Sequence, residues 1–205
     1  MTPLSSLSAE AAARDPDGLA LVFDGREISF ADLHRRVEGV AGELRSHGVS
    51  AGTPVGVGTV NTAEAVATLL AVWRLGAIVI DLAPGLSGTD RRSAVERTGA
   101  PVLWSSEGLT ETGVHAQGPA LELACVTFTS GSTGIPKGVM LGEDNLVRNA
   151  ELYVRHFRLT PADRTCLVLP LSFGMNKIAL LAHLSIGAGV LLEPDFMVPN
   201  RALGA

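Results

Sequence analysis

Short continuous apolar runs alternate with helical patterns along most of this chain, and this alternation restricts the fold more than any other feature. Helical patterns cover 62–76, 89–99 and 144–159, and a fourth lies between the last two apolar runs. Solid rather than alternating apolar runs are expected where helices cover both faces of a sheet. Strands separated by helices pair in parallel, so the sequence predicts a doubly wound, mostly parallel α/β sheet flanked by helices. The apolar runs lie at 54–60, 77–81, 101–105, 121–129, 164–170 and 189–193.

The first part of the chain follows a different pattern. Residues 19–30 fit two short strands about an Asp-Gly turn, which is a hairpin signal, and residues 30–48 fit an amphipathic helix that ends in glycine. A lone hairpin is marginally stable in water, so it needs a surface to pack against. We therefore divide the chain into an N-terminal hairpin and helix, 1–50, and a parallel α/β subdomain, 51–205. Within the latter, the Gly-, Ser- and Thr-rich residues 105–120 are expected to form a surface loop.

Charge and apolar content exclude some classes of partner. The formal net charge of -5 gives no electrostatic reason to expect nucleic acid or an anionic membrane surface. The opening residues lack the basic region and apolar core of a signal peptide. A long apolar stretch at 166–193 is interrupted by Pro170, Asn176, Lys177 and His183, so we do not expect it to span a membrane.

The two cysteines, Cys125 and Cys166, each lie inside an apolar run. Buried free thiols explain such positions better than a disulfide does. Free thiols are typical of a reducing compartment, so the sequence favours a cytoplasmic protein.

The segment TFTSGSTGIPKGVML, residues 127–141, is the strongest candidate site in the α/β subdomain. Its glycines allow backbone N–H groups to converge on an anion, and its Ser and Thr hydroxyls are further donors. Lys137 adds a positive charge. A flexible turn is the alternative interpretation. A hydroxyl at nearly every non-glycine position up to Thr133, and the rigid Pro136 beside the lysine, favour a phosphate-binding loop.

Two common nucleotide motifs are not matched. Lys137 stands between Pro136 and Gly138, so the loop lacks the Gly-Lys-Ser/Thr of a Walker A motif and its hydroxyl for Mg²⁺. Residues 56–61, GVGTVN, form an incomplete dinucleotide fingerprint without a third glycine, and we interpret them as a strand end. The missing lysine–hydroxyl pair, and the lack of a metal-binding carboxylate cluster, argue against an independent small ATPase or kinase.

The loop closely resembles the signature loop of the AMP-forming adenylating enzymes, which include acyl- and aryl-CoA synthetases, luciferases and peptide-synthetase adenylation domains. Three further segments resemble other blocks of this family, in the family's order. Four blocks over nearly the whole chain make the resemblance specific, and it implies an incomplete form of the large N-terminal domain of such an enzyme. The further segments are ISFADLHRRVEGVAGELRSHGV, LAVWRLGAIVIDLAP and LPLSFGMNKIALLAHLSIGAGVLL.

Members of the family activate a carboxylic acid with Mg·ATP, forming an acyl-adenylate and pyrophosphate. They then usually pass the acyl group to the thiol of CoA or of a carrier protein. The resemblance implies that the complete enzyme uses ATP and Mg²⁺ and that this chain alone binds neither tightly. It also implies that this chain contains no catalytic residue and no metal ligand. It implies that the β- and γ-phosphates of ATP are bound by Thr129, Ser130, Gly131, Ser132, Thr133, Gly134, Lys137 and Gly138.

The chain departs from the family pattern in two places. Residues 142–146 read GEDNL where Thr/Ser-His-x-Asn-Leu is common, although Asp144 or Asn145 can still cap the next helix. The segment LPLSFGMN is shorter than the usual form, which bears on the shape of the acyl pocket that Phe173 and Gly174 would border. No Asp lies near Phe173 of the kind that holds a substrate ammonium in amino-acid-activating members, and this disfavours an amino-acid substrate.

Several other polar residues have a structural interpretation. His183 lies in an apolar helical pattern and is expected to pack or cap rather than to catalyse. Lys177, from the same helix, is expected to extend its ammonium group to solvent. Four further histidines show no metal-ligand spacing: His34, His47, His115 and His156.

Family members are much longer than this chain. The part without a counterpart here carries the adenine-binding turn, a Thr-Glu pair associated with Mg²⁺, the ribose-binding Asp and the mobile C-terminal domain with its catalytic lysine. We therefore expect an ATP-phosphate-binding portion that is inactive alone. It would need a complementary C-terminal polypeptide, in cis or in trans, or self-association, and residues 1–50 would pack partly on the missing half. The alternative is a non-catalytic nucleotide- or phosphate-binding module, or a degenerate partner of a synthetase.

Overall fold

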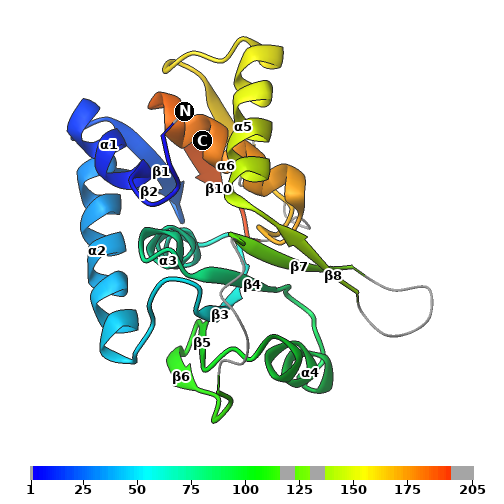
Figure 1. Cartoon of the computed structure of the whole chain (residues 1–205). Coiled ribbons are helices and arrows are strands. Elements are labelled where there is room, and N and C mark those ends of the chain that lie inside the picture. The colour runs from blue at the N-terminus through cyan, green and yellow to red at the C-terminus, as the bar shows by residue number, and fades with distance from the viewer. Residues whose placement is uncertain (1, 116–122, 130–136, 195–205) are drawn as a thin grey trace.

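The structure is a computed structural model that describes residues 2–115, 123–129 and 137–194. It contains two β-sheets, with helices between them and on their outer sides (Figure 1).

The larger sheet has six strands in the order β6-β5-β3-β4-β7-β8. Its centre is parallel, since β3 pairs in parallel with β4 and β5, and β4 pairs in parallel with β7. The edge strands β6 and β8 are antiparallel to their neighbours. The predicted doubly wound, mostly parallel α/β class is therefore confirmed. The strands are β3 (Pro54–Gly58), β4 (Ile78–Leu82), β5 (Val102–Ser105), β6 (Gly108–Glu111), β7 (Cys125–Thr129) and β8 (Lys137–Leu141).

Both edge strands were missed by the sequence analysis. β6 lies inside the segment assigned to a surface loop, and it forms because a tight turn brings Gly108, at a φ of +99°, opposite Ser105. β8 was included in the predicted loop. Its first four residues are exposed, so the strand carries no burial-driven apolar pattern.

The smaller sheet has four strands in the order β2-β1-β10-β9. It confirms the predicted hairpin, whose turn residues Asp24 and Gly25 have φ values of 50° and 71°. β1 also pairs in parallel with β10, so the hairpin finds a neighbouring strand in the C-terminal part of the same chain. The strands are β1 (Leu19–Phe23), β2 (Arg26–Ser29), β9 (Arg164–Leu167) and β10 (Gly189–Leu192).

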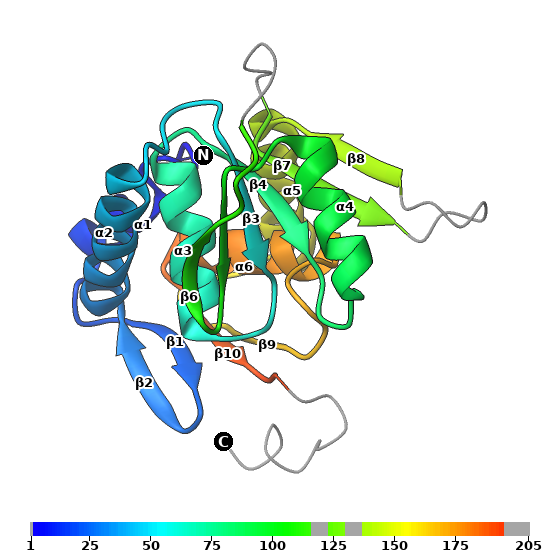
Figure 2. The same cartoon turned by 90° about the horizontal axis from the view of Figure 1, so that it is seen from below.

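Helices α3 and α6 lie between the two sheets (Figure 1). α3 contacts β3 and β4, and α6 contacts β9 and β10 while its Lys177 reaches β4. α2 packs on α3, α5 packs on α6, and α4 covers the outer face of the larger sheet (Figure 2). The helices are α1 (Leu7–Arg14), α2 (Phe30–Ser46), α3 (Ala63–Arg74), α4 (Gly88–Thr98), α5 (Glu143–Phe157) and α6 (Gly174–Ile186).

Strand β4 shows why its apolar run is continuous. Its residues alternate between two cores, because side chains along a strand point to opposite faces. Ile78, Ile80 and Leu82 belong to the smaller core beside α4, whereas Val79 belongs to the larger core between the sheets. Asp81 shares the face of Val79, so its carboxylate points into the space between the sheets, toward α6.

Asn61 joins the two sheets near the carboxyl ends of their strands. It follows β3, and its Nδ2 lies 2.8 Å from the carbonyl oxygens of Leu167 and Leu169 and 3.0 Å from that of Glu193. These carbonyls follow or end β9 and β10. The side chain is buried, so the three contacts replace water around its NH₂ group, whereas its Oδ1 has no hydrogen-bond partner among the described residues.

Across the described residues, no helix is long and apolar enough to cross a membrane. Both cysteines are free thiols, Cys125 buried and Cys166 half-buried.

Candidate functional site

The predicted phosphate-binding loop connects β7 to β8. Thr129 ends β7 and pairs with Lys137, the first residue of β8, so the loop begins at the carboxyl end of a central parallel strand. In doubly wound sheets ligands bind at this edge. Five of the predicted phosphate ligands lie outside the described residues: Ser130, Gly131, Ser132, Thr133 and Gly134.

Gly138 has a packing role that explains part of the loop's glycine content. It pairs with Phe128 across the hairpin. A Cβ atom at Gly138 would lie 3.1 Å from Cγ1 of Val126 and 3.4 Å from the ring of Phe128. A larger residue would therefore require these two side chains to shift by a few tenths of an ångström. Lys137 is exposed at the start of β8.

The segment from Leu169 to Lys177 crosses the carboxyl end of the larger sheet. The N–H of Leu171 donates to the carbonyl of Thr59, directly after β3, at 3.0 Å. Phe173 is the N-cap of α6 and is 53% exposed, and Gly174, the first residue of α6, is exposed too. Leu169 and Met175 are also exposed. The two predicted border residues of the acyl pocket therefore lie in an exposed apolar surface.

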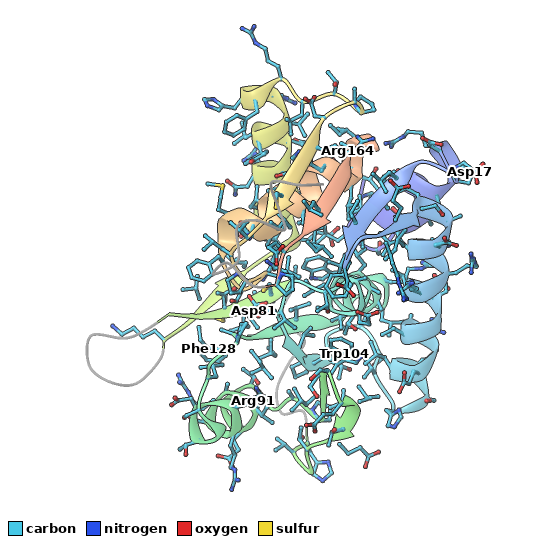
Figure 3. All side chains as sticks on the ribbon, turned by 180° about the vertical axis from the view of Figure 1, so that it is seen from behind. Asp17, Asp81, Arg91, Trp104, Phe128 and Arg164 are labelled. Atoms are coloured by element: carbon cyan, nitrogen blue, oxygen red, sulfur yellow. The ribbon has the colours of Figure 1, made fainter. Side chains whose placement is uncertain are left out.

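Behind these two regions lies a buried polar cluster formed by Asp81, Cys125, Thr127 and Lys177. Asp81 Oδ2 accepts from Lys177 Nζ at 2.5 Å, from Thr127 Oγ1 at 2.5 Å and from Cys125 Sγ at 3.3 Å. Lys177 Nζ also donates to Cys125 Sγ at 3.0 Å. Asp81 lies inside the molecule (Figure 3), and the Asp81 and Lys177 side chains are each 1% exposed.

The protonation states in the cluster follow from burial and from the Asp81 charge. Burial opposes the ammonium form of Lys177, but the neighbouring carboxylate outweighs it, and the pKa of Lys177 is raised. Burial, together with the negative charge of Asp81, raises the pKa of Cys125 to about 12. At neutral pH Lys177 therefore carries its charge beside Asp81, and the Cys125 thiol stays protonated.

The expectation that Lys177 extends to solvent was wrong. Its ammonium group turns inward because the Asp81 carboxylate neutralises it there. The sequence contained a signal for this contact, since Asp81 interrupts an apolar strand and Lys177 interrupts an apolar helix. Two isolated opposite charges in apolar segments can be predicted to pair with each other. His183 packs as expected. It is buried, and its Nδ1 lies 2.8 Å from the carbonyl of Ala179.

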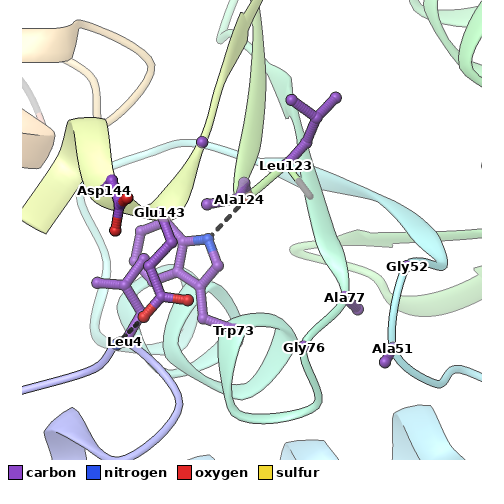
Figure 4. A pocket seen from close by; sticks show the side chains of 11 residues that line it. Leu4, Ala51, Gly52, Trp73, Gly76, Ala77, Leu123, Ala124, Glu143 and Asp144 are labelled. Atoms are coloured by element: carbon purple, nitrogen blue, oxygen red, sulfur yellow. Dashed lines mark hydrogen bonds between the residues drawn. The ribbon is translucent and has the colours of Figure 1, made fainter. Parts of the chain in front are cut away.

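A separate pocket of about 500 Å³ lies at the opposite, amino end of the larger sheet (Figure 4). Trp73 Nε1 donates to the carbonyl of Ala124 at 2.8 Å there, and the N–H of Leu4 donates to Glu143 Oε1 at 2.8 Å. The pocket precedes β4 and β7, whereas the predicted loop follows β7. It is therefore distinct from the candidate phosphate and acyl sites.

No group of three or more His, Cys, Asp or Glu side chains that could hold a metal ion occurs in the described part of the chain.

The fold is that of a doubly wound α/β protein, with the candidate loop at the carboxyl end of β7. The family model of the AMP-binding enzymes matches residues 8–122 and 104–204. The chain therefore belongs to the AMP-binding enzyme family.

Comparison with individual proteins agrees with this membership. Phosphinothricin tripeptide synthetase PhsC of Streptomyces viridochromogenes is 31% identical over 95% of this chain and 20% of its own length. Phenyloxazoline synthase MbtB of Mycobacterium tuberculosis is 29% identical over 90% of this chain and 14% of its own length. The chain thus spans a small part of these curated relatives.

A solved structure of O-succinylbenzoate coenzyme A synthetase of Bacillus subtilis, in complex with AMP, has the same fold. It superimposes with a TM-score of 0.83 and 24% identity, covering 98% of this chain and 58% of that one. At this identity the likeness concerns the fold.

The cluster predicts an unreactive Cys125. In a Cys166→Ser variant, Cys125 should resist alkylation at mildly alkaline pH while the protein is folded, because the thiol is buried and remains protonated. After unfolding in urea it should react fully. The matched Cys125→Ser variant, which keeps the half-buried Cys166, serves as the control. Rapid labelling of folded Cys125, followed by mass spectrometry, would contradict the described cluster.

Proposed function

We propose that this chain is the ATP-phosphate-binding portion of an AMP-forming ligase that joins a carboxylic acid to a thiol. The observation that carries the proposal is the family match over nearly the whole chain. The loop agrees with it, since it is rich in glycine and hydroxyl groups and leaves the carboxyl end of β7.

The proposed reaction has two steps. A carboxylate oxygen of the acid attacks the α-phosphorus of ATP, and pyrophosphate leaves. The thiol sulfur then attacks the acyl carbon, its proton is lost, and AMP leaves as the thioester forms. The loop would bind the β- and γ-phosphates, which become the leaving group. Its backbone N–H groups, the hydroxyls of Ser130, Ser132 and Thr133 and the Lys137 ammonium would stabilise that charge.

ATP would be used with Mg²⁺, and the family membership supports the use of ATP. We assign no Mg²⁺ ligand to this chain. The ligands would come from the completing polypeptide.

The acid would contact the exposed apolar surface at Phe173 and Gly174. Space is open above Gly174, where an added Cβ would meet no atom within 4 Å. The thiol is CoA or a carrier protein. Both are consistent with the comparisons, since PhsC is a peptide synthetase and the Bacillus subtilis protein is a coenzyme A synthetase. We place the protein in the cytoplasm, where its two free thiols remain reduced.

A completing polypeptide, in cis or in trans, or another copy of the chain would supply the rest of the site, and the chain alone would be inactive. Large exposed apolar side chains of the described residues support this proposal. They are Val139, Met140, Leu152, Phe157, Leu169, Phe173 and Met175. Residues 1–50 would contribute through β2, an edge strand whose outer side has no strand partner among the described residues.

The phosphate role of the loop is tested by Lys137→Ala. Affinity for pyrophosphate or ATP, measured by calorimetry, should fall about tenfold or more, since a charge-assisted hydrogen bond contributes about 1.5–3 kcal/mol. The fold should persist, because Lys137 is exposed. The matched control is Arg148→Ala, an exposed cation on α5, which should bind normally. Unchanged affinity in the Lys137 variant, or no binding by the parent even with the completing polypeptide present, would reduce the loop to an ordinary turn.

The contribution of residues 1–50 is tested by light scattering combined with amide hydrogen exchange. We expect either self-association, or exchange in residues 1–50 that is faster than in the central strands and slows when the completing polypeptide is added. A strictly monomeric chain, whose residues 1–50 are as protected as β3 and β4, would be a finished domain. That result would refute the split of the site between two polypeptides.

A further inference from the structure

The buried cluster connects three elements that are far apart in the sequence. One carboxylate oxygen, Asp81 Oδ2 on β4, accepts from Thr127 on β7 and from Lys177 on α6. Asp81 and Lys177 are 96 positions apart. The cluster therefore fixes the start of α6 against two neighbouring strands of the larger sheet.

Stability alone does not account for this ion pair. Transferring two charges from water to the interior has a large desolvation cost, and well-packed apolar residues of similar size often stabilise a protein equally well or better. Asp81 also retains a buried oxygen, Oδ1, without a hydrogen-bond partner among the described residues. An apolar pair would avoid both costs. The presence of an ion pair at this position therefore needs an explanation other than stability.

The residues beside the cluster supply that explanation. Thr127 lies two positions before Thr129, where β7 ends and the predicted phosphate loop begins. Lys177 lies in the first turn of α6, three positions after Gly174, and its N–H donates to the carbonyl of Phe173 at 3.2 Å. The same carboxylate thus holds the base of the phosphate loop and the border of the acyl surface.

We propose that Asp81 and Lys177 are positioning residues, which hold the end of β7 and the first turn of α6 in one fixed relation. The phosphate loop and the acyl surface would then keep a constant separation while ATP and the acid are bound. This inference rests on the proposed function, which gives the fixed relation its purpose. The fixed relation of the two segments can itself be measured without a ligand.

The test uses the double variant Asp81→Leu/Lys177→Met, because removal of one partner leaves an unpaired buried charge and the single variants are expected to lose stability. The double variant should melt within a few degrees of the parent. Amide hydrogen exchange of residues 127–129 and 174–177 should nevertheless accelerate about tenfold, and pyrophosphate affinity should fall about tenfold, the scale on which residues supporting a site from behind act. The control is Glu38→Gln/Arg74→Met, which removes an exposed ion pair between α2 and α3.

The outcomes separate this inference from the proposed function. If exchange in both segments is unchanged in a stable double variant, the positioning role is overturned. If exchange accelerates but affinity is unchanged, the pair holds the segments without serving the site, and the inference is also overturned. If the parent binds no pyrophosphate while exchange accelerates, the proposed function fails and the fixed relation of the two segments stands. A double variant that does not fold would show that the pair is needed for the fold itself, and that overturns a role limited to positioning.

Discussion

The hydrogen bonds of the Asp81 carboxylate join the elements from which the candidate site is built. The carboxylate lies where β4, β7 and α6 meet, and it accepts hydrogen bonds from the ammonium of Lys177 and the hydroxyl of Thr127 inside the molecule. Burying these charges is costly unless each finds a partner at short distance. These contacts connect the start of α6 to two strands of the larger sheet. The exposed start of α6 and the end of β7 lie next to these contacts, and we infer that the contacts hold both segments in place.

The two sheets bring several strand ends to one region of the molecule. Asn61 contacts carbonyls at the ends of β9 and β10, and the segment that follows β9 crosses the end of β3. The predicted loop leaves β7 at the same edge of the larger sheet. In doubly wound proteins this edge carries the ligands, and it is where we propose that phosphate and acid bind.

Local patterns in the sequence were sufficient for the parallel sheet, the hairpin and its turn at Asp24. They were insufficient for β6 and β8, because edge strands with exposed residues lack an apolar pattern. Helix α1 was missed although its alanines favour a helix. The inward position of Lys177 depends on a partner 96 residues away, and only the tertiary fold brings them together. The loop was predicted from its composition and from its resemblance to the family's signature loop. Most of its predicted phosphate ligands lie outside the described residues.

The most direct test of the central claim is pyrophosphate–ATP exchange with a panel of carboxylic acids. The chain would be assayed alone and together with a polypeptide that carries the remainder of the family's domain. We predict no acid-dependent exchange by the chain alone, because we propose that another polypeptide supplies half of the nucleotide site, and orientation provides much of the acceleration. Acid-dependent exchange should appear in the mixture and be lost with Lys137→Ala. Robust exchange by the pure chain, or a mixture that remains inactive with every acid while binding ATP, would contradict the account.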